Sequence, residues 1–123
     1  MHANGVEVTA VVITRFSGQP SALDFKKRLE RHGMQVFLHG PIEGYPNDLE
    51  KIASPEGFGS NEYIPVTQPL VVLTGPGPNS GKMGTCLNQM YHEFKQGRVA
   101  RYAKFETFPV WNLPLNHPVN IAY

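Results

Sequence analysis

An apolar run, a glycine-rich turn and a Gly-Lys pair follow one another in the middle of the chain and constrain its fold most strongly. The chain reads LVVLT over residues 70–74 and GPGPNSGK over residues 75–82. A strand that enters a glycine-rich turn and leaves through Gly-Lys into a helix is the layout of a phosphate-binding loop. Backbone N–H groups at a helix start, with one ammonium beside them, attract an anion. The pattern predicts a strand, a phosphate-binding loop and a helix over residues 70–97.

This segment, named the 75–82 loop below, departs from the standard pattern of G-x-x-x-x-G-K followed by Ser or Thr. The first glycine of that pattern would fall on Pro76, which instead lies between Gly75 and Gly77. Pro76 and Pro78 lack N–H donors. Met83 stands where a hydroxyl would bind Mg²⁺, and a thioether does not bind a hard cation. The remaining donors are enough for one phosphate, whereas a metal-bridged triphosphate is harder to hold.

We therefore expect a phosphate-bearing small molecule, a nucleotide or a phosphate or sulfate ion at this loop. A structural or assembly domain with a proline-stiffened turn and no ligand is the alternative. A metal-dependent NTPase is a further alternative, which Met83 disfavours. The predicted phosphate-binding residues are Gly75, Gly77, Asn79, Ser80, Gly81, Lys82 and Arg15.

Apolar and amphipathic segments alternate along the whole chain, as they do in an α/β domain with a mostly parallel sheet. The chain also holds 12 glycines and 11 prolines among 123 residues, which predicts many loops. We expect one α/β domain over residues 1–123, with a three-layer Rossmann-like or phosphate-loop-like sheet. The expected strands are residues 8–14, 34–39, 70–74 and 103–108, and the expected helices are residues 21–32, 47–53 (with Asn47 as N-cap) and 81–96.

The helix after the loop carries apolar residues at helical spacing, which predicts a face turned to the core. That stripe consists of Met83, Leu87, Met90, Tyr91 and Phe94.

The carboxyl ends of parallel strands meet at one edge of a sheet, where ligands bind. On the expected strands, that edge brings Arg15, His39 and Glu106 near the 75–82 loop. Arg15 would clamp a phosphate with two hydrogen bonds. His39 or Glu106 would transfer a proton, which makes these two the candidate catalytic residues. Polar residues end the strands of many α/β domains, so a purely structural role is the other interpretation.

Composition argues against several classes of partner and site. A formal net charge of +1 gives no reason to expect nucleic acid or an anionic membrane as partner. No apolar run is long enough to cross a bilayer, and the N-terminus lacks the form of a signal peptide. A single cysteine, Cys86, excludes an intramolecular disulfide, and five scattered histidines predict no metal site. A cytoplasmic protein is the simplest expectation.

Several longer motifs carry a resemblance to a known family. They are SGQP at 17–20, PIEGYP at 41–46, SPEGFG at 54–59, TGPGPNSGKMGTCLNQMYHE at 74–93 and YAKFETFPVWNLPLNHPVNIAY at 102–123. These blocks resemble domain-of-unknown-function family 1846, also called uncharacterised protein family 0371, from about Gly5 to Tyr123. Members are bacterial proteins several times longer, and the match is to an internal segment of them.

The resemblance implies that these 123 residues are a domain fragment whose sheet neighbours or second domain lie outside it. The remaining domains of the full-length protein are then the expected partners. Self-association through uncovered faces is a second expectation. The resemblance brings no established activity to the chain.

Overall fold

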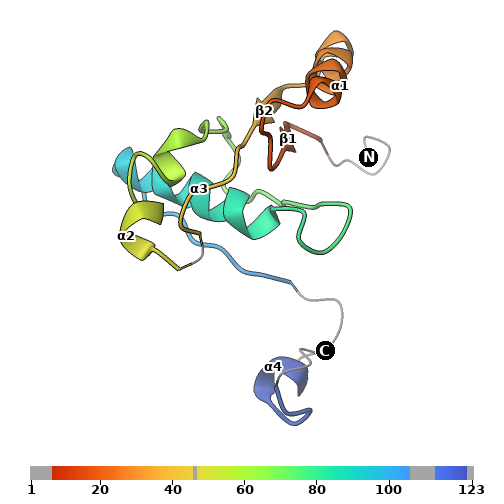
Figure 1. The fold of residues 1–123 in the computed structure, drawn as a ribbon. Coiled ribbons are helices and arrows are strands. Elements are labelled where there is room, and N and C mark those ends of the chain that lie inside the picture. Colours follow the sequence, from red (N-terminus) through yellow and green to blue (C-terminus); the bar gives the residue numbers. More distant parts are fainter. Residues whose placement is uncertain (1–6, 46, 106–112, 122–123) are drawn as a thin grey trace.

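The computed structural model describes residues 7–45, 47–105 and 113–121, and Figure 1 shows their arrangement. The part of the chain up to the loop contains β1 (Val11–Ile13), α1 (Pro20–Arg31), β2 (Val36–Leu38), the short α2 (Leu49–Ile52) and the 3-10 helix η2 (Phe58–Ser60). The loop is followed by α3 (Lys82–Lys95), and the short α4 (Pro118–Ile121) comes last.

The two strands pair in parallel and form the sheet of the described residues. Val11 lies opposite Val36 and Ile13 lies opposite Leu38. The helix α1 connects them, so β1, α1 and β2 make a βαβ unit, which Figure 1 shows at one end of the molecule. The α/β class is therefore confirmed in its coarse form, as a small domain with a two-stranded parallel sheet.

The long helices form close to where the sequence predicts them. The helix α1 begins with Pro20, whose fixed φ suits the first helical position, and Gly33 follows it with a φ of +80°. The helix α3 ends before Gly97, which has a φ of +77°. For α2, the predicted cap was wrong by one residue, because Asp48 rather than Asn47 caps it and accepts from Lys51 N at 3.2 Å.

Residues 70–74 do not form the predicted strand. Leu70 and Val72 are 81% and 82% exposed. The sequence LVVLT over residues 70–74 is uncharged and partly β-branched, which is typical of a buried strand. A strand needs hydrogen-bonding partners, and no neighbour pairs with this segment within the described residues. The prediction of a fourth strand at 103–108 fails at residues 103–105, which are irregular, and its other residues lie outside the described ranges.

The core of the described part draws its residues from β2, α2, η2 and segment 61–64, and α3 packs against η2. Its buried apolar residues are Val36, Ile52, Phe58 and Ile64. The predicted apolar stripe of α3 was wrong at both ends, since Met83 is 41% and Phe94 is 75% exposed. Thr85 and Asn88 are the buried residues of α3 instead.

Candidate functional site

The 75–82 loop turns into α3 through two left-handed residues. Asn79 has a φ of +55° and Gly81, the N-cap of α3, has a φ of +86°. Glycine and asparagine adopt this region more easily than other residues, which explains their placement here. No side chain caps the helix, so the first turn of α3 lacks the acceptor that Ser, Thr, Asp or Asn commonly supplies.

The loop is anchored to the carboxyl end of β1. Thr14, the residue after β1, donates its hydroxyl hydrogen to Ser80 O at 2.8 Å. A Cβ atom on Gly81 would lie 2.8 Å from Thr14 Cγ2, so only glycine permits this approach. The loop therefore lies beside the carboxyl end of β1. Arg15 follows Thr14 directly and is exposed.

The Lys82 ammonium folds back over its own loop. Nζ donates to Gly77 O at 2.7 Å and to Ser80 Oγ at 3.0 Å. An ammonium has three N–H donors, so one remains for a further acceptor. Within the described residues, no carboxylate forms an ion pair with Lys82.

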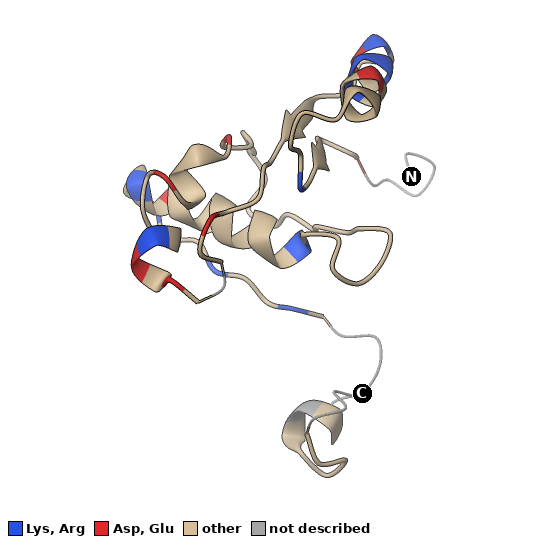
Figure 2. Cartoon of the chain, viewed as in Figure 1, with Lys and Arg blue, Asp and Glu red and all other residues tan. Residues whose placement is uncertain are grey.

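The backbone donors of the loop are open. Among the described residues, none accepts a hydrogen bond from the N–H groups of Gly77, Asn79, Ser80, Gly81 or Lys82. They lie at the positive end of the dipole of α3. Residues 63–81 contain no charged side chain, and Figure 2 shows the loop before α3 without acidic colour. This arrangement can hold an anion.

His39, one candidate catalytic residue, lies in a buried polar cluster and makes no described contact with the loop. Its Nε2 is 2.9 Å from Glu62 O, and its exposed fraction is 3%. Burial lowers the pKa of His39 below the usual 6.5. Glu106, the other candidate, lies outside the described residues.

Side chains of α3 hold the extended segment 61–64 by its backbone, an interaction that the sequence reasoning missed. Gln89 donates to Ile64 O at 2.6 Å and accepts from Ile64 N at 3.2 Å. Asn88 donates to Glu62 O at 3.3 Å, and His92 Nε2 lies 2.7 Å from Asn61 O. We call Asn88, Gln89 and His92 the α3 clamp. The available signal was the polar spacing of Thr85, Asn88 and His92 along one helix face.

Charged groups extend the clamp toward solvent. Glu93 accepts a hydrogen bond from Tyr63 Oη at 2.7 Å and pairs with Arg98. Hydrogen bonds from the Arg98 guanidinium and the Tyr63 hydroxyl lower the pKa of Glu93. The hydrogen bond between Tyr63 and Glu93 also raises the pKa of Tyr63. Burial raises the pKa of the Cys86 thiol, which favours the protonated form.

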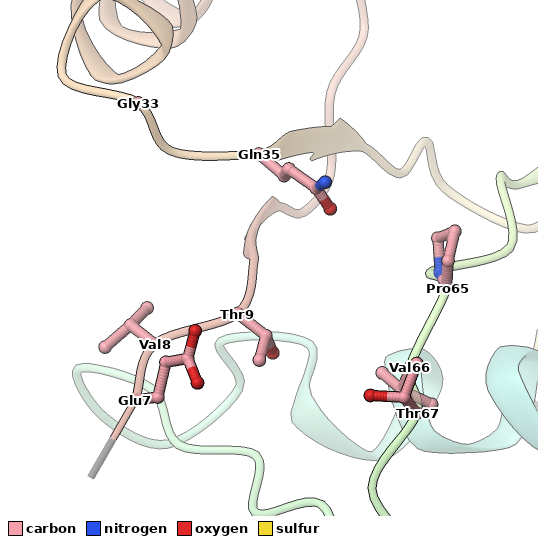
Figure 3. A pocket seen from close by; sticks show the side chains of 8 residues that line it. All are labelled: Glu7, Val8, Thr9, Gly33, Gln35, Pro65, Val66 and Thr67. Carbon is pink, nitrogen blue, oxygen red and sulfur yellow. The ribbon is translucent and has the colours of Figure 1, made fainter. Parts of the chain in front are cut away.

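A pocket of about 350 Å³ lies at the opposite end of β1 from the 75–82 loop. Figure 3 shows the residues that line it, which are residues 7–9, Gly33, Gln35 and residues 65–67. None of the predicted site residues lines it. It therefore does not belong to the predicted phosphate site.

Residues 7–45, 47–105 and 113–121 bring together no group of three or more His, Cys, Asp or Glu side chains that could hold a metal ion. The helices of these ranges also include none of the length and apolar character needed to cross a membrane.

Comparison with known proteins places the chain in a family. The family model described as "Domain of unknown function DUF1846, N-terminal" matches residues 1–123. A UPF0371 protein of Clostridioides difficile (strain 630) is 61% identical over 118 residues, which are 96% of this chain and 24% of that protein. UPF0371 proteins of Clostridium tetani and Clostridium botulinum (strain ATCC 19397 / Type A) are 60% and 59% identical over the same shares. The chain spans about a quarter of the length of these curated relatives. The chain therefore belongs to the DUF1846 family of uncharacterised proteins, also named UPF0371, and matches its N-terminal domain.

Proposed function

We propose that the 75–82 loop binds the phosphate group of a small molecule or nucleotide. One observation carries the proposal: α3 begins without a side-chain cap, beside open N–H donors and an ammonium that folds over the same loop. Helix starts of this kind bind phosphate in other proteins because the N–H groups and the helix dipole both favour a negative charge. A free phosphate or sulfate ion offers the same chemistry.

The charge around the loop supports an anion as the ligand. Lys82 has no carboxylate partner among the described side chains, and residues 63–81 carry no acid that would repel a phosphate. Arg15 follows the residue that anchors the loop, and it supplies a second cation for the same phosphate. In this proposal Lys82 keeps its contacts to the loop and offers its third N–H to the ligand.

The loop favours one phosphate group over a metal-bridged triphosphate. Pro76 and Pro78 remove two donors from the loop, and Met83 gives no ligand to Mg²⁺. We therefore place a phosphorylated metabolite or a nucleotide held through one phosphate ahead of NTP hydrolysis. His39 is bound to a backbone carbonyl in the buried cluster, so the proposal gives it no role at the loop.

Binding of inorganic phosphate, pyrophosphate, ATP and a sugar phosphate tests the proposal by isothermal titration calorimetry. At least one of these ligands should bind the wild-type chain, and Lys82→Ala should weaken binding about tenfold or more, as expected for a charge-assisted contact. Lys27→Ala is the matched control, because Lys27 is an exposed residue of α1. This variant should bind the ligand with the affinity of the wild-type chain.

Two results would overturn the proposal. One is that none of the four ligands binds the wild-type chain. The other is that Lys82→Ala and Lys27→Ala bind the ligand with equal affinity, because the ammonium of the loop would then contribute nothing.

A further inference from the structure

Residues 70–73, which read LVVL, expose an apolar segment of high β-propensity. Leu70 is 81%, Val71 is 51% and Val72 is 82% exposed, whereas Leu73 is half-buried. Branched apolar side chains of this kind occur mainly in strands covered on both faces. A run of exposed apolar residues indicates a surface that another polypeptide covers.

The backbone of this segment is as uncovered as its side chains. Within the described residues, the N–H and C=O groups of residues 70–74 form no hydrogen bond. Exposed strand edges usually carry charges that prevent edge-to-edge association. Residues 63–81 contain none, whereas the exposed apolar residues Val99 and Phe105 alternate with Arg98, Arg101 and Lys104. Residues 70–73 therefore lack the charged neighbours that would protect an exposed apolar stretch from association, whereas residues 98–105 have them.

We propose that residues 70–73 are a strand that pairs with a strand from the part of the longer family chain that follows the N-terminal domain. The family model describes an N-terminal domain, and the C. difficile relative contains this region as only 24% of its length. Most of such a chain therefore lies beyond the matched region. Its covalent link keeps that part at a high effective concentration near the segment, which favours it over a second copy. The inference does not depend on phosphate binding.

Hydrogen exchange tests the pairing in two chains. One is this 123-residue chain, and the other joins these residues to the remainder of the C. difficile relative. Amide hydrogens of residues 70–73 should exchange at least about a hundredfold more slowly in the longer chain, because pairing protects them. Equal exchange in both chains would overturn the proposal.

Substitutions separate pairing from a general effect of exposed charge. In the longer chain, Val72→Lys should lower Tm by several degrees and restore fast exchange at residues 70–73. Leu49→Lys is the matched control, because Leu49 is 74% exposed on α2 and outside the segment, and it should leave both readouts unchanged. Equal effects of the two substitutions would contradict the proposal.

Analytical ultracentrifugation of the 123-residue chain tests whether a second copy of the chain, and not the remainder of the longer chain, covers residues 70–73. A dimer that Val72→Lys dissociates would show that a second copy covers the segment, and this would overturn the proposal. Lys82→Ala in the longer chain should leave exchange at residues 70–73 unchanged, so that a failure of phosphate binding is distinguishable from a failure of strand pairing.

Discussion

His39 and His92, which come from different parts of the fold, contact two consecutive carbonyl oxygens of the segment 61–64. His39, directly after β2, places Nε2 2.9 Å from Glu62 O, and His92 of α3 places Nε2 2.7 Å from Asn61 O. Each contact requires a proton on Nε2, which neutral histidine can supply as one tautomer. The two side chains therefore join β2 and α3 through the segment 61–64.

The burial of His39 makes stability depend on pH. Because the native pKa of His39 lies below the unfolded value of 6.5, the unfolded chain binds more protons as the pH falls below 6.5. The free energy of unfolding should fall as pH decreases from 6.5 toward the native pKa, by at most about 1.4 kcal/mol per pH unit for this one group. Urea denaturation between about pH 8 and pH 5 measures this slope.

Substitutions assign that slope to one residue. His39→Gln should flatten the pH dependence of unfolding, because glutamine does not titrate. His32→Gln is the control at an exposed histidine and should keep the wild-type slope. The same slope in His39→Gln would contradict the assignment.

The α3 clamp predicts unequal costs for two neighbouring amides. Gln89 makes two hydrogen bonds to Ile64, so Gln89→Leu should destabilise the fold by about 1–3 kcal/mol. Asn88 is 0% exposed, and its Oδ1 has no hydrogen-bond partner among the described residues. Asn88→Leu removes that unpaired oxygen and should therefore cost less than Gln89→Leu. Urea denaturation of both variants gives the comparison, and a larger loss in Asn88→Leu would refute the prediction.

Gly81 is predicted to tolerate no side chain. A Cβ atom there would meet Thr14 Cγ2 at 2.8 Å, and the φ of +86° is unfavourable for alanine. Gly81→Ala should destabilise the fold by about 1–3 kcal/mol. Gly84→Ala should stabilise the fold by up to about 1 kcal/mol, because Gly84 lies inside α3 and a Cβ atom there would meet no other atom within 4 Å. Urea denaturation of the two variants measures both effects.

A double-mutant cycle checks the contact itself. Thr14→Gly removes the Cγ2, Cβ and Oγ1 atoms that a Cβ atom at position 81 would meet at 2.8, 2.9 and 3.1 Å, so it should recover part of the loss caused by Gly81→Ala. Strictly additive losses would mean that the clash with Thr14 does not cause the destabilisation.

The helices could be predicted from the sequence because their limits are local. Pro20 and Gly33 bound α1, and Gly81 and Gly97 bound α3, each through its own backbone preference. The anchoring of the 75–82 loop beside β1 could not be predicted from a strand over residues 70–74, because that strand does not form. The contacts between Thr14 and residues 80 and 81 hold the loop there instead.

Features that depend on distant partners could not be predicted. LVVL at 70–73 has the composition of a strand, but pairing requires a neighbour that the described residues do not provide. The spacing of polar residues on α3 was visible in the sequence, but their partner was not, because Asn88 and Gln89 bind the backbone of the distant segment 61–64. Apolar spacing along a helix does not reveal such a partner.

The most direct test of phosphate binding follows the backbone N–H groups of the 75–82 loop by NMR while inorganic phosphate is added. Phosphate binding at the loop should cause saturable shifts of the Gly77, Asn79, Ser80, Gly81 and Lys82 amide signals, and these shifts should be lost in Lys82→Ala. Signals that stay in place at saturating phosphate, or that shift equally in wild type and Lys82→Ala, would contradict it.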